Sequence, residues 1–398
     1  MPILGVTAMK NKRLHIGVCG IGFGHASRSL ALIKALNENG WETSISSYGD
    51  GLRYLRSFGI DVKPVPEVSY GILPEAKVSI KMTIHRNLLL PLKFLSQIAC
   101  ELNYAEGASL VISDTRASTI LAAKIAGKPV LTILNQFNIR VEYPRYRRLI
   151  ELIEALSQVV GEFWALSDKI LVTDYPPPHT ISAQNLVIPD DLSEKVEFIG
   201  PVVEKKIDEL PSIEKLCEKY GLDPEGEPII FYHATGPSYE RKMLTDIILP
   251  ILDELSSEYQ IIATLGGDSP KIKLQGVKVY SWIDEPLELI KLSSAVISRA
   301  GQTTLAKVLA YGKPVIMIPI PGHAEQLGNA SSVAENGAGV LLQQERLSRQ
   351  VLRKSIEAVL GESSFRENAE KYSSIILNLN PVEKIVSAAE NLAAGGSL

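Results

Sequence analysis

The sequence has few cysteines, no long apolar run and no surplus of either charge. Its three cysteines, Cys19, Cys100 and Cys217, are scattered and show no Cys-x-x-Cys spacing. This argues against a disulfide framework or a zinc site and fits a reducing compartment. No run approaches the roughly 18 apolar residues of a membrane-spanning helix, and the start of the chain lacks the apolar core of a signal peptide. We therefore expect a cytoplasmic protein.

The balance of charges disfavours nucleic acid as a partner. There are 41 Lys and Arg residues against 45 Asp and Glu, for a net charge of −4, whereas a nucleic-acid-binding chain shows a basic surplus or stripe. With 45% hydrophobic and 22% charged residues, the chain has the composition of a soluble globular protein. Its 398 residues are too many for one ordinary core, so two domains are expected.

Strand and helix patterns alternate along the whole chain, which predicts an α/β fold with parallel sheets covered by helices. One series ends at 197–202, interpreted as a last strand and a hinge, and a second begins at 228. We expect two Rossmann-like domains, 1–202 and 203–398, facing each other across a cleft. The last helix, about 381–394, is a candidate to pack back on the first domain. The expected strands are 15–19, 42–47, 110–113, 130–134 and 169–173, then 228–232, 260–264, 277–280, 295–298 and 314–318.

The stretch 298–304, Ser-Arg-Ala-Gly-Gln-Thr-Thr, carries the clearest chemical signal. It follows the apolar run 295–297 and opens a helix expected over 303–311. The first-turn N–H groups of a helix have no partner within it, and the peptide dipoles place partial positive charge there, so an anion is favoured. Arg299 adds a permanently charged, forked donor. We interpret the stretch as a seat for the diphosphate of a sugar nucleotide.

The first strand leads into a glycine loop, 20–28, with His25 at its sixth position. A dinucleotide fingerprint needs Gly or Ala there and an acidic residue after the second strand, but 46–48 is Ser-Ser-Tyr, which disfavours NAD. A histidine at the carboxyl end of a parallel strand lies where open α/β sheets place their chemistry, and imidazole suits proton removal from a hydroxyl. The alternative is that His25 only caps the following helix.

Asp114 follows another apolar strand, 110–113, again at the carboxyl end. Its carboxylate could accept from one ring nitrogen of His25 and steady the imidazolium, as in hydrolase triads. The competing interpretation makes Asp114 the N-cap of a helix beginning near Arg116. One oxygen could serve each role, so both interpretations stay open.

These two regions together resemble the GT-B glycosyltransferases. The loop 20–28 resembles their Gly-x-Gly-His loop, and 298–304 with Glu325-Gln326 resembles their donor-site signature. The MurG-type transferase, which adds N-acetylglucosamine to a lipid-linked acceptor, is the nearest match, and UDP-glycosyltransferases share the layout more loosely. The specific part spans 298–330, while the resemblance in architecture covers nearly the whole chain. It implies an inverting hexosyltransferase that moves a sugar from a nucleotide-diphosphate sugar, a UDP-sugar foremost, to a hydroxyl.

The resemblance also implies roles for individual residues. His25 would be the base and Asp114 its partner. The loop 233–238 would close over the phosphates, 282–283 would hold the nucleobase, and 325–326 would bind hydroxyls of the transferred sugar. A plain turn, domain packing and a solvated helix start are the respective alternatives. The implied donor-binding residues are Gly24, Thr235, Gly236, Ser238, Trp282, Ile283, Arg299, Gly301, Gln302, Thr303, Thr304, Glu325 and Gln326.

One position departs from the family pattern. Lys307 stands where the family usually has a Glu that chelates the ribose hydroxyls, and an ammonium cannot accept from a diol. The ribose contact is then lost or supplied elsewhere, which questions UDP as the nucleotide and leaves a catalytically silent binding subunit as an alternative. No Asp-x-Asp pair, the metal motif of the other major transferase fold, occurs. We expect no metal and no cofactor, with Arg299 and the helix start stabilising the leaving diphosphate.

The acceptor is poorly specified. Segments 80–93, basic and apolar, and 145–166, amphipathic, could each rest on a membrane surface beside a lipid-linked acceptor. Core-facing helices with solvated charges are the plainer interpretation. A non-hydrolysing sugar-nucleotide 2-epimerase, which shares the two-domain layout, is the remaining alternative for the function.

Overall fold

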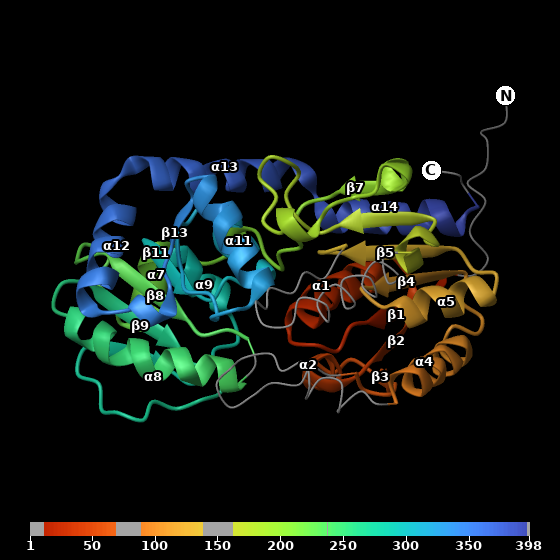
Figure 1. The fold of residues 1–398 in the computed structure, drawn as a ribbon, viewed down its shortest axis with the longest axis horizontal. Coiled ribbons are helices and arrows are strands. Elements are labelled where there is room, and N and C mark those ends of the chain that lie inside the picture. Colours follow the sequence, from red (N-terminus) through yellow and green to blue (C-terminus); the bar gives the residue numbers. More distant parts are fainter. Residues whose placement is uncertain (1–11, 69–88, 138–161, 237, 396–398) are drawn as a thin grey trace.

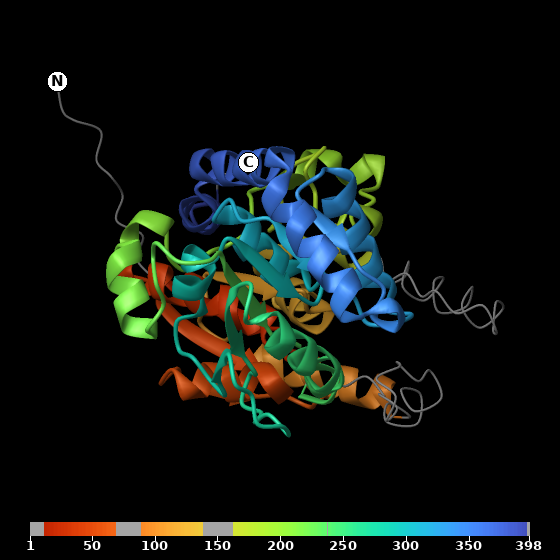
Figure 2. The same ribbon diagram turned by 90° about the vertical axis from the view of Figure 1, so that its left-hand side faces the viewer.

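The computed structural model describes residues 12–68, 89–137, 162–236 and 238–395, and these form two lobes (Figure 1). Within these residues the first lobe has a seven-stranded sheet of order β3-β2-β1-β4-β5-β6-β7, and the second a six-stranded sheet of order β10-β9-β8-β11-β12-β13. Each strand pairing is parallel. Figure 2 looks at the second lobe from its end, where the teal strands run between green and blue helices. The expected α/β fold with two parallel sheets is confirmed.

Strands and helices alternate through the first lobe, as the sequence pattern predicts. Its strands are β1 (Arg13–Val18), β2 (Glu42–Ser47), β3 (Val62–Pro64), β4 (Leu110–Asp114), β5 (Val130–Leu134), β6 (Lys169–Val172) and β7 (Val196–Phe198). Its α-helices are α1 (Gly24–Glu38), α2 (Gly49–Ser57), α4 (Leu90–Tyr104) and α5 (Ala117–Ile125).

The second lobe continues the same alternation. Its strands are β8 (Ile229–His233), β9 (Gln260–Thr264), β10 (Val277–Tyr280), β11 (Ala295–Ser298), β12 (Val315–Met317) and β13 (Gly339–Leu341). Its α-helices are α7 (Ile213–Tyr220), α8 (Ser238–Leu255), α9 (Pro286–Leu292), α10 (Gln302–Ala310), α11 (Ala324–Glu335), α12 (Arg349–Gly361) and α13 (Ser363–Leu379), and α14 (Pro381–Ala393) follows.

The cores form on both faces of each sheet, because successive side chains of a strand point to opposite sides. In β8, Phe231 belongs to the cluster under α7, α9 and α10, while Ile230 and Tyr232 belong to the cluster under α8 and α12. In β4, Ile112 and Val111 divide in the same way between the two clusters of the first lobe. This explains why the central strands β8 and β11 consist mostly of apolar residues on both faces.

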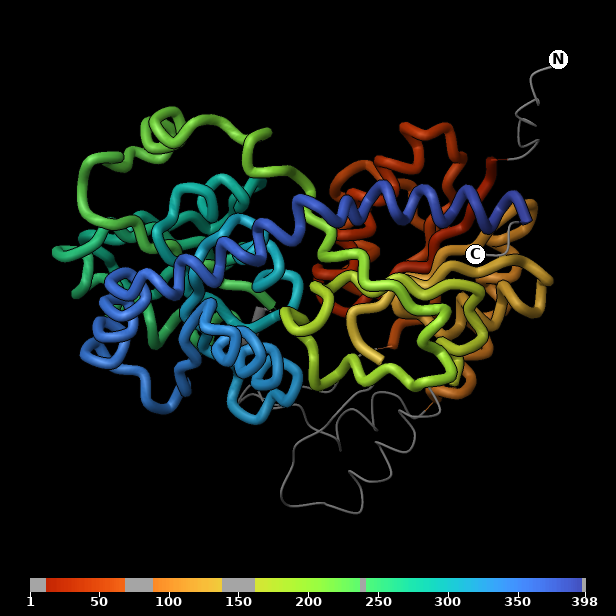
Figure 3. Tube along the Cα trace, turned by 90° about the horizontal axis from the view of Figure 1, so that it is seen from above, coloured from red at the N-terminus to blue at the C-terminus, as the bar shows by residue number. Residues whose placement is uncertain are grey.

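The chain crosses between the lobes at two places. The first crossing follows β7, where Gly200 has φ +86° and packs against Ile376 and Leu379 of α13, so a side chain there would collide. The second is Asn380, left-handed at φ +44°, between α13 and α14. Figure 3 shows these two helices, in blue, running across both lobes. Helix α14 contributes Ile385 and other side chains to the core of the first lobe.

Each sheet reverses its strand order beside its first strand, and this point sets the location of the site. In the first sheet the chain moves outward from β1 to β2 and β3, then returns to the other side with β4. In the second sheet β8 and β11 stand in the same relation. Open α/β sheets bind ligands in the crevice outside the carboxyl ends of the strands at such points. The loops after β1, β4, β8 and β11 therefore form the predicted binding edges.

Most differences from the expected elements lie at sheet edges. The short edge strands β3 and β13 were not expected, because three residues are too few to show a period. The last strand of the first lobe ends at Phe198 and not at 202, because the chain turns at Gly200. Of the helix expected over 145–166, only 162–166 are described, and 162–165 are helical. In the described part of the chain, no helix is long and apolar enough to cross a membrane.

Candidate active site

A cleft of about 700 Å³ lies between the lobes at the two points where the strand order reverses. The first lobe lines it with the loop after β1 and the ends of β4 and β5. The second lobe lines it with the loops after β8 and β11 and with the start of α11. The cleft thus collects residues from both halves of the chain. The lining includes His25, Gly24, Thr235, Gly236, Trp282, Ile283, Arg299, Gly301, Gln302, Thr303, Thr304, Glu325 and Gln326.

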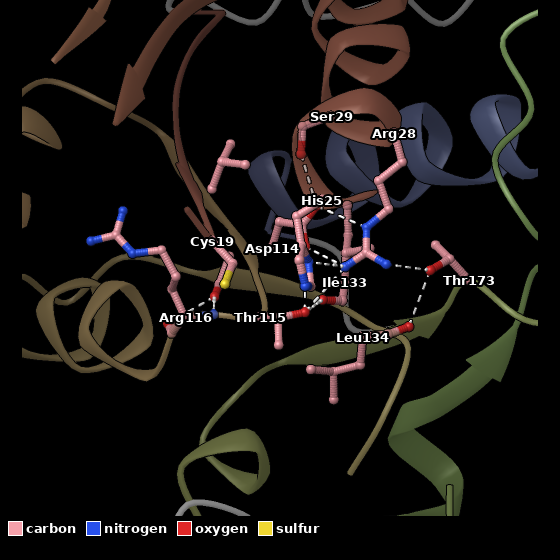
Figure 4. A network of polar contacts seen from close by, with 12 residues as sticks. Cys19, His25, Arg28, Ser29, Asp114, Thr115, Arg116, Ile133, Leu134 and Thr173 are labelled. Atoms are coloured by element: carbon pink, nitrogen blue, oxygen red, sulfur yellow. Dashed lines mark hydrogen bonds and ion pairs between the residues drawn. The ribbon is translucent and has the colours of Figure 1, made fainter. Parts of the chain in front are cut away.

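His25 and Asp114 form a pair on the first-lobe side of the cleft (Figure 4). His25 Nδ1 lies 2.9 Å from Asp114 Oδ1, and the side chain of His25 is 15% exposed while that of Asp114 is fully buried. The carboxylate selects the tautomer, because a ring lone pair facing a carboxylate lone pair would be repelled. Arg28 Nη2 also lies 2.9 Å from Nδ1. With the proton on Nδ1, His25 donates a hydrogen bond to Asp114 and Nε2 keeps a free lone pair. This is the arrangement of a general base with an orienting partner.

Asp114 is not the N-cap of the next helix. Helix α5 begins at Ala117 with Arg116 as N-cap, and no side chain caps it. The Asp114 carboxylate instead accepts from Arg28 Nε at 2.9 Å and from Ser29 Oγ at 2.8 Å, besides His25. Burial raises the pKa of this carboxyl, but the adjacent Arg28 and His25 outweigh burial and hold its pKa well below its usual range. Asp114 is therefore ionised.

The glycine loop brings the two lobes into contact. Gly24 is the first residue of α1, and a Cβ on it would lie 2.8 Å from Thr303 Oγ1 in the first turn of α10. The N-termini of α1 and α10, one from each lobe, face each other at the cleft, and both carry partial positive charge. A side chain at position 24 would therefore require the Thr303 side chain to shift.

The turn after β11 has the features of an anion seat. Gly301 is the N-cap of α10, and no side chain caps the helix. Thr304 N and Leu305 N bond to Gly301 O, both at 3.0 Å, so the N–H groups of Gln302 and Thr303 are the ones without a helical acceptor. Thr303 and Thr304 line the cleft and add hydroxyl donors. The geometry suits a diphosphate.

Arg299 lines the cleft, as the sequence predicts, but its guanidinium also bonds within the second lobe. Its side chain is buried, and its Nη1 donates to Ile318 O at 3.1 Å and to Gln344 Oε1 at 2.7 Å. The guanidinium therefore ties the end of β11 to the segments after β12 and β13. Its positive charge therefore lies at the wall of the cleft while Nη1 holds neighbouring segments of the lobe together.

Arg241 is a second guanidinium beside the cleft that the sequence analysis missed. It lies on the second turn of α8, lines the cleft, and donates through Nη1 to Gly236 O at 2.6 Å. Gly266, at φ +61°, leaves room for it, because a Cβ there would lie 2.7 Å from Arg241 Nε. A positive charge near the loop 235–238 is expected for an anion site. The sequence signal was an arginine close behind a Gly-Pro-Ser turn.

The loop after β8 faces the seat from the other side. Thr235 Oγ1 lies 3.4 Å from Ser298 Oγ, and Ser298 donates to His233 O at 2.9 Å, so the ends of β8 and β11 are linked. Gly236 has φ +97° and is exposed. Ser238 begins α8. Thr235 and Gly236 therefore line the cleft beside the end of β11.

Glu325 and Gln326 begin α11 at the edge of the cleft, with His323 as N-cap. Glu325 is half-buried and lines the cleft. Gln326 is buried, and its Oε1 accepts from Ile320 N at 3.0 Å, so the amide helps to hold the preceding turn. Glu325 is consequently better placed than Gln326 to accept from a ligand hydroxyl.

Trp282 is not packed into a domain core. Its side chain is 51% exposed on the wall of the cleft, and Nε1 donates to Asp284 Oδ1 at 3.0 Å. Ile283 beside it is partly buried against the second-lobe core. An exposed aromatic ring beside an apolar side chain is a surface on which a planar base can lie.

Lys307 is engaged in a bridge between the lobes. Its Nζ donates to Ser27 Oγ on α1 at 2.9 Å and to Glu204 Oε1 at 2.5 Å, and Ser27 Oγ donates to the same oxygen at 2.6 Å. Burial raises the pKa of Glu204, but Lys307 and Ser27 lower it by a larger amount. The net pKa lies below the usual value, and the carboxyl is ionised. The lysine that replaces the expected ribose-binding Glu is therefore neutralised by a carboxylate from the crossing segment.

His233, the last residue of β8, begins the loop 233–238 that the sequence analysis places over the phosphates. Its Nδ1 lies 2.8 Å from Thr264 Oγ1, and its ring stacks on Phe231. Burial, with Lys307 nearby, lowers the pKa of His233 to about 3. The folded protein therefore holds a neutral imidazole beside the anion seat.

This shift predicts a loss of stability in mild acid. The unfolded chain takes up a proton on His233 below about pH 6.5, while the folded chain does not, so the unfolded state binds more protons as the pH falls. The free energy of unfolding should drop by about 2 kcal/mol from this group between pH 7 and pH 5. Urea titrations of wild type and His233→Asn at both pH values measure it. An equal drop in the variant would assign the loss to other groups.

Both halves of the chain match models of glycosyltransferase families. A family model described as the glycosyltransferase family 28 C-terminal domain matches residues 232–388, and one described as glycosyl transferase family 1 matches 12–201. An uncharacterized glycosyltransferase of Methanosarcina acetivorans is 26% identical over 366 residues, covering 90% of this chain and 93% of its own. A Clostridium perfringens protein named UDP-N-acetylglucosamine--N-acetylmuramyl-(pentapeptide) pyrophosphoryl-undecaprenol N-acetylglucosamine transferase is 32% identical over 164 residues, 39% of this chain and 43% of its own.

Solved structures share the fold over nearly the whole chain. The calicheamicin glycosyltransferase has a TM-score of 0.69 at 15% identity, covering 97% of this chain and 99% of its own. The glycosyltransferase VinC, solved with dTDP, has a TM-score of 0.65 at 18% identity, covering 96% of this chain and 100% of its own. MurG of Acinetobacter baumannii has a TM-score of 0.58 at 17% identity, covering 95% of this chain and 99% of its own.

Proposed function

Since the chain is a glycosyltransferase of the GT-B fold, related to MurG-like transferases, we propose that it moves a sugar from a nucleoside-diphosphate sugar to a hydroxyl acceptor, with inversion and without a metal. The observation that carries this proposal is the juxtaposition of two sites. The ionised Asp114 orients His25 on one wall, and the uncapped start of α10 lies on the other, where Thr303 touches Gly24. A base and an anion seat within one cleft are what group transfer from a diphosphate requires.

The donor belongs to the second lobe. Its diphosphate would lie between the α10 start and the loop 235–238, where the N–H groups of Gln302 and Thr303 and nearby hydroxyls can donate. Arg241 and the two helix dipoles supply positive charge, so the leaving diphosphate is stabilised by groups that are already oriented. The nucleobase would lie against Trp282, and Glu325 would accept from the transferred sugar.

The acceptor approaches from the first lobe. Its hydroxyl gives its proton to His25 Nε2, and the oxygen attacks the anomeric carbon on the face opposite the diphosphate. The bond from that carbon to the diphosphate oxygen breaks, and the configuration inverts. Asp114 stabilises the imidazolium that forms, because Nδ1–H points at a buried carboxylate.

A uridine nucleotide is the first candidate for the donor. The relative that shares 32% identity over 164 residues carries UDP-N-acetylglucosamine in its name. The Lys307 ammonium cannot accept a hydrogen bond from a ribose diol. It donates instead to the carboxylate of Glu204. A dTDP-sugar is the second candidate, since the solved structure of a chain with the same fold holds dTDP.

The experiment that tests the function has two parts. A thermal-shift panel of nucleoside diphosphates and their sugars identifies the donor, because a ligand that binds the folded state raises the Tm. Nucleotide release is then followed with and without a candidate hydroxyl acceptor. Release that depends on the acceptor supports transfer, and product isolated without acceptor and with an altered sugar would favour the epimerase. If none of the sugar nucleotides raises the Tm of the protein, the proposal is contradicted.

A lipid-linked acceptor would bring the protein to a membrane surface. Leu89, Leu92 and Leu95 form an exposed stripe at the start of α4, each at least 60% exposed. Such a stripe is expected to insert among lipid headgroups and acyl chains. The basic residues of 80–88 and 145–161, to which the sequence analysis also assigned membrane contact, lie outside the described residues.

Vesicle sedimentation tests this surface. We expect anionic vesicles to carry down the wild type and to lose several-fold of the bound fraction with the double variant Leu92→Ser, Leu95→Ser. Leu377→Ser on α13 is the matched control, since Leu377 is 61% exposed on another part of the protein. Equal sedimentation of all three proteins would argue for an acceptor in solution.

A further inference from the structure

The Arg28 guanidinium is the central group of a buried network that the mechanism above does not use. It lies on the second turn of α1, three residues after His25, and is only 5% exposed. Its Nε donates to Asp114 Oδ2 at 2.9 Å and its Nη2 donates to Asp114 Oδ1, so it holds both carboxylate oxygens (Figure 4). A two-pronged pair of this kind restricts the carboxylate to one orientation.

The orientation of the carboxylate matters for His25. Oδ1 is shared between Arg28 and His25 Nδ1, so the oxygen that orients the imidazole is itself placed by the guanidinium. Arg28 also supplies the positive charge that keeps a fully buried carboxyl ionised, since burial alone would favour its neutral form. A neutral carboxyl would stabilise the imidazolium less, and a rotated one would release the ring.

The same guanidinium reaches toward the other lobe. Arg28 Nη1 donates to Thr173 Oγ1 at 3.1 Å, just beyond β6. The peptide carbonyl of Thr173 accepts from Gln302 Nε2 at 3.0 Å. Gln302 is buried and is the first residue of α10, the helix that carries the anion seat. Thr173 thus bonds to the His25 network with its hydroxyl and to the donor helix with its carbonyl.

We propose that Arg28 is a positioning residue, and that the bonds from Arg28 to Thr173 and from Thr173 to Gln302 set the distance between the base and the donor seat. The proposal rests on the transfer function proposed above and adds to it side-chain bonds between the lobes that the mechanism above does not use. It also changes the role of Gln302, whose side-chain amide links the two lobes beside the anion seat through its bond to Thr173 O. Arg28 fits an acid–base machinery, because a buried arginine is always charged and its fork matches a carboxylate.

Substitutions of single members of the network test the proposal. The Thr173 hydroxyl also donates to Leu134 O at 3.3 Å, within the first lobe. Arg28→Ala should lower kcat about 100-fold with donor KM within about threefold of wild type, and Arg28→Lys should retain part of the rate because it keeps the charge and loses the fork. Thr173→Val removes only the hydroxyl, and should lower kcat about tenfold. Its matched control is Thr132→Val, a buried threonine of β5 that bonds to Ser167 Oγ away from the cleft. Thr132→Val should keep the wild-type kcat.

A positioning role and a merely structural role differ in how the losses combine. In a His25→Ala background, Arg28→Ala should cause no further loss of the residual rate, since Arg28 acts through His25. Losses that multiply would overturn the proposal, as would an Arg28→Ala variant with wild-type kcat. Should Arg28→Ala fail to fold, Arg28→Lys and Thr173→Val carry the same comparison, with circular dichroism and Tm as the check on folding.

Gln302→Leu separates the coupling from donor binding. It removes the bond to Thr173 O, and should lower kcat about tenfold while the donor affinity measured by titration stays within about threefold. Weaker donor binding with unchanged kcat would show that Gln302 serves the donor and would overturn the coupling. Failure of the function itself has a different signature. It would leave the wild type without acceptor-dependent nucleotide release, or leave His25→Ala as active as the wild type.

Discussion

Replacement of His25 by alanine should lower kcat on the order of 10³-fold while the affinity for the sugar nucleotide stays near that of the wild type. The imidazole is the group on the first-lobe wall whose free Nε2 can accept a proton, and a positioned base contributes on the order of 10²- to 10⁴-fold. The donor seat lies on the second lobe, so its contacts do not include the ring. Single-turnover rates and donor titrations of the same preparation measure the two quantities.

The control for this substitution is another histidine outside the cleft. His179 packs against Tyr372 of α13 and is not among the described residues that line the cleft, so His179→Gln should transfer at the wild-type rate. An active His25→Ala variant would remove the base assignment. A variant that no longer binds the donor would show that His25 belongs to the seat and not to the acceptor side.

Asp114→Asn should lower activity on the order of 10³-fold or more and also destabilise the fold. The Asn amide donates where the carboxylate accepts, so Nδ1 of His25 becomes the acceptor and Nε2 carries the proton, which is the wrong tautomer for a base. The same change leaves the Arg28 guanidinium buried without its counter-ion. Breaking a buried pair by removing one partner costs on the order of 3 kcal/mol.

Urea unfolding and initial rates at several pH values test both effects of the Asp114 substitution. Asp168→Asn is the control, because Asp168 pairs with Lys124 near the surface, where a comparable change should cost less than about 1 kcal/mol. The double variant Asp114→Asn, Arg28→Met should recover part of the stability and none of the activity, since it removes the orphaned charge. Full activity of Asp114→Asn would reduce Asp114 to a structural role.

The parallel strands and the helix starts could be predicted because their signals are local. The apolar runs that became β5 (Val130–Leu134) and β11 (Ala295–Ser298) are buried on both faces and therefore have no polar alternate. The glycine loop, Asp114 and the turn at Gly301 were recognised because each follows such a run. Carboxyl ends of parallel strands meet at one edge, and the pattern alone thus brings His25 and Asp114 to the same side of their sheet.

The direction of individual side chains was less predictable. Arg299 was expected at the anion seat, but its Nη1 also donates a hydrogen bond to the side chain of Gln344, 45 residues away. Lys307 looked like a lost ribose contact, whereas it pairs with Glu204 and with Ser27, which is 280 residues away in the sequence. No short window contains both members of such pairs, so no periodicity or spacing reports them.

Order along the chain was enough to settle the fold class, the two parallel sheets and the loops that carry chemistry, because hydrophobic period and turn residues act over a few neighbours. Packing of distant segments decided the rest: which carboxylate oxygen Arg28 and His25 share, how closely Gly24 approaches Thr303, and which guanidinium lies beside the seat. A side chain bonds to whichever partner the neighbouring helix, strand or loop places beside it. Those neighbours are distant in the sequence and come together only in the folded protein.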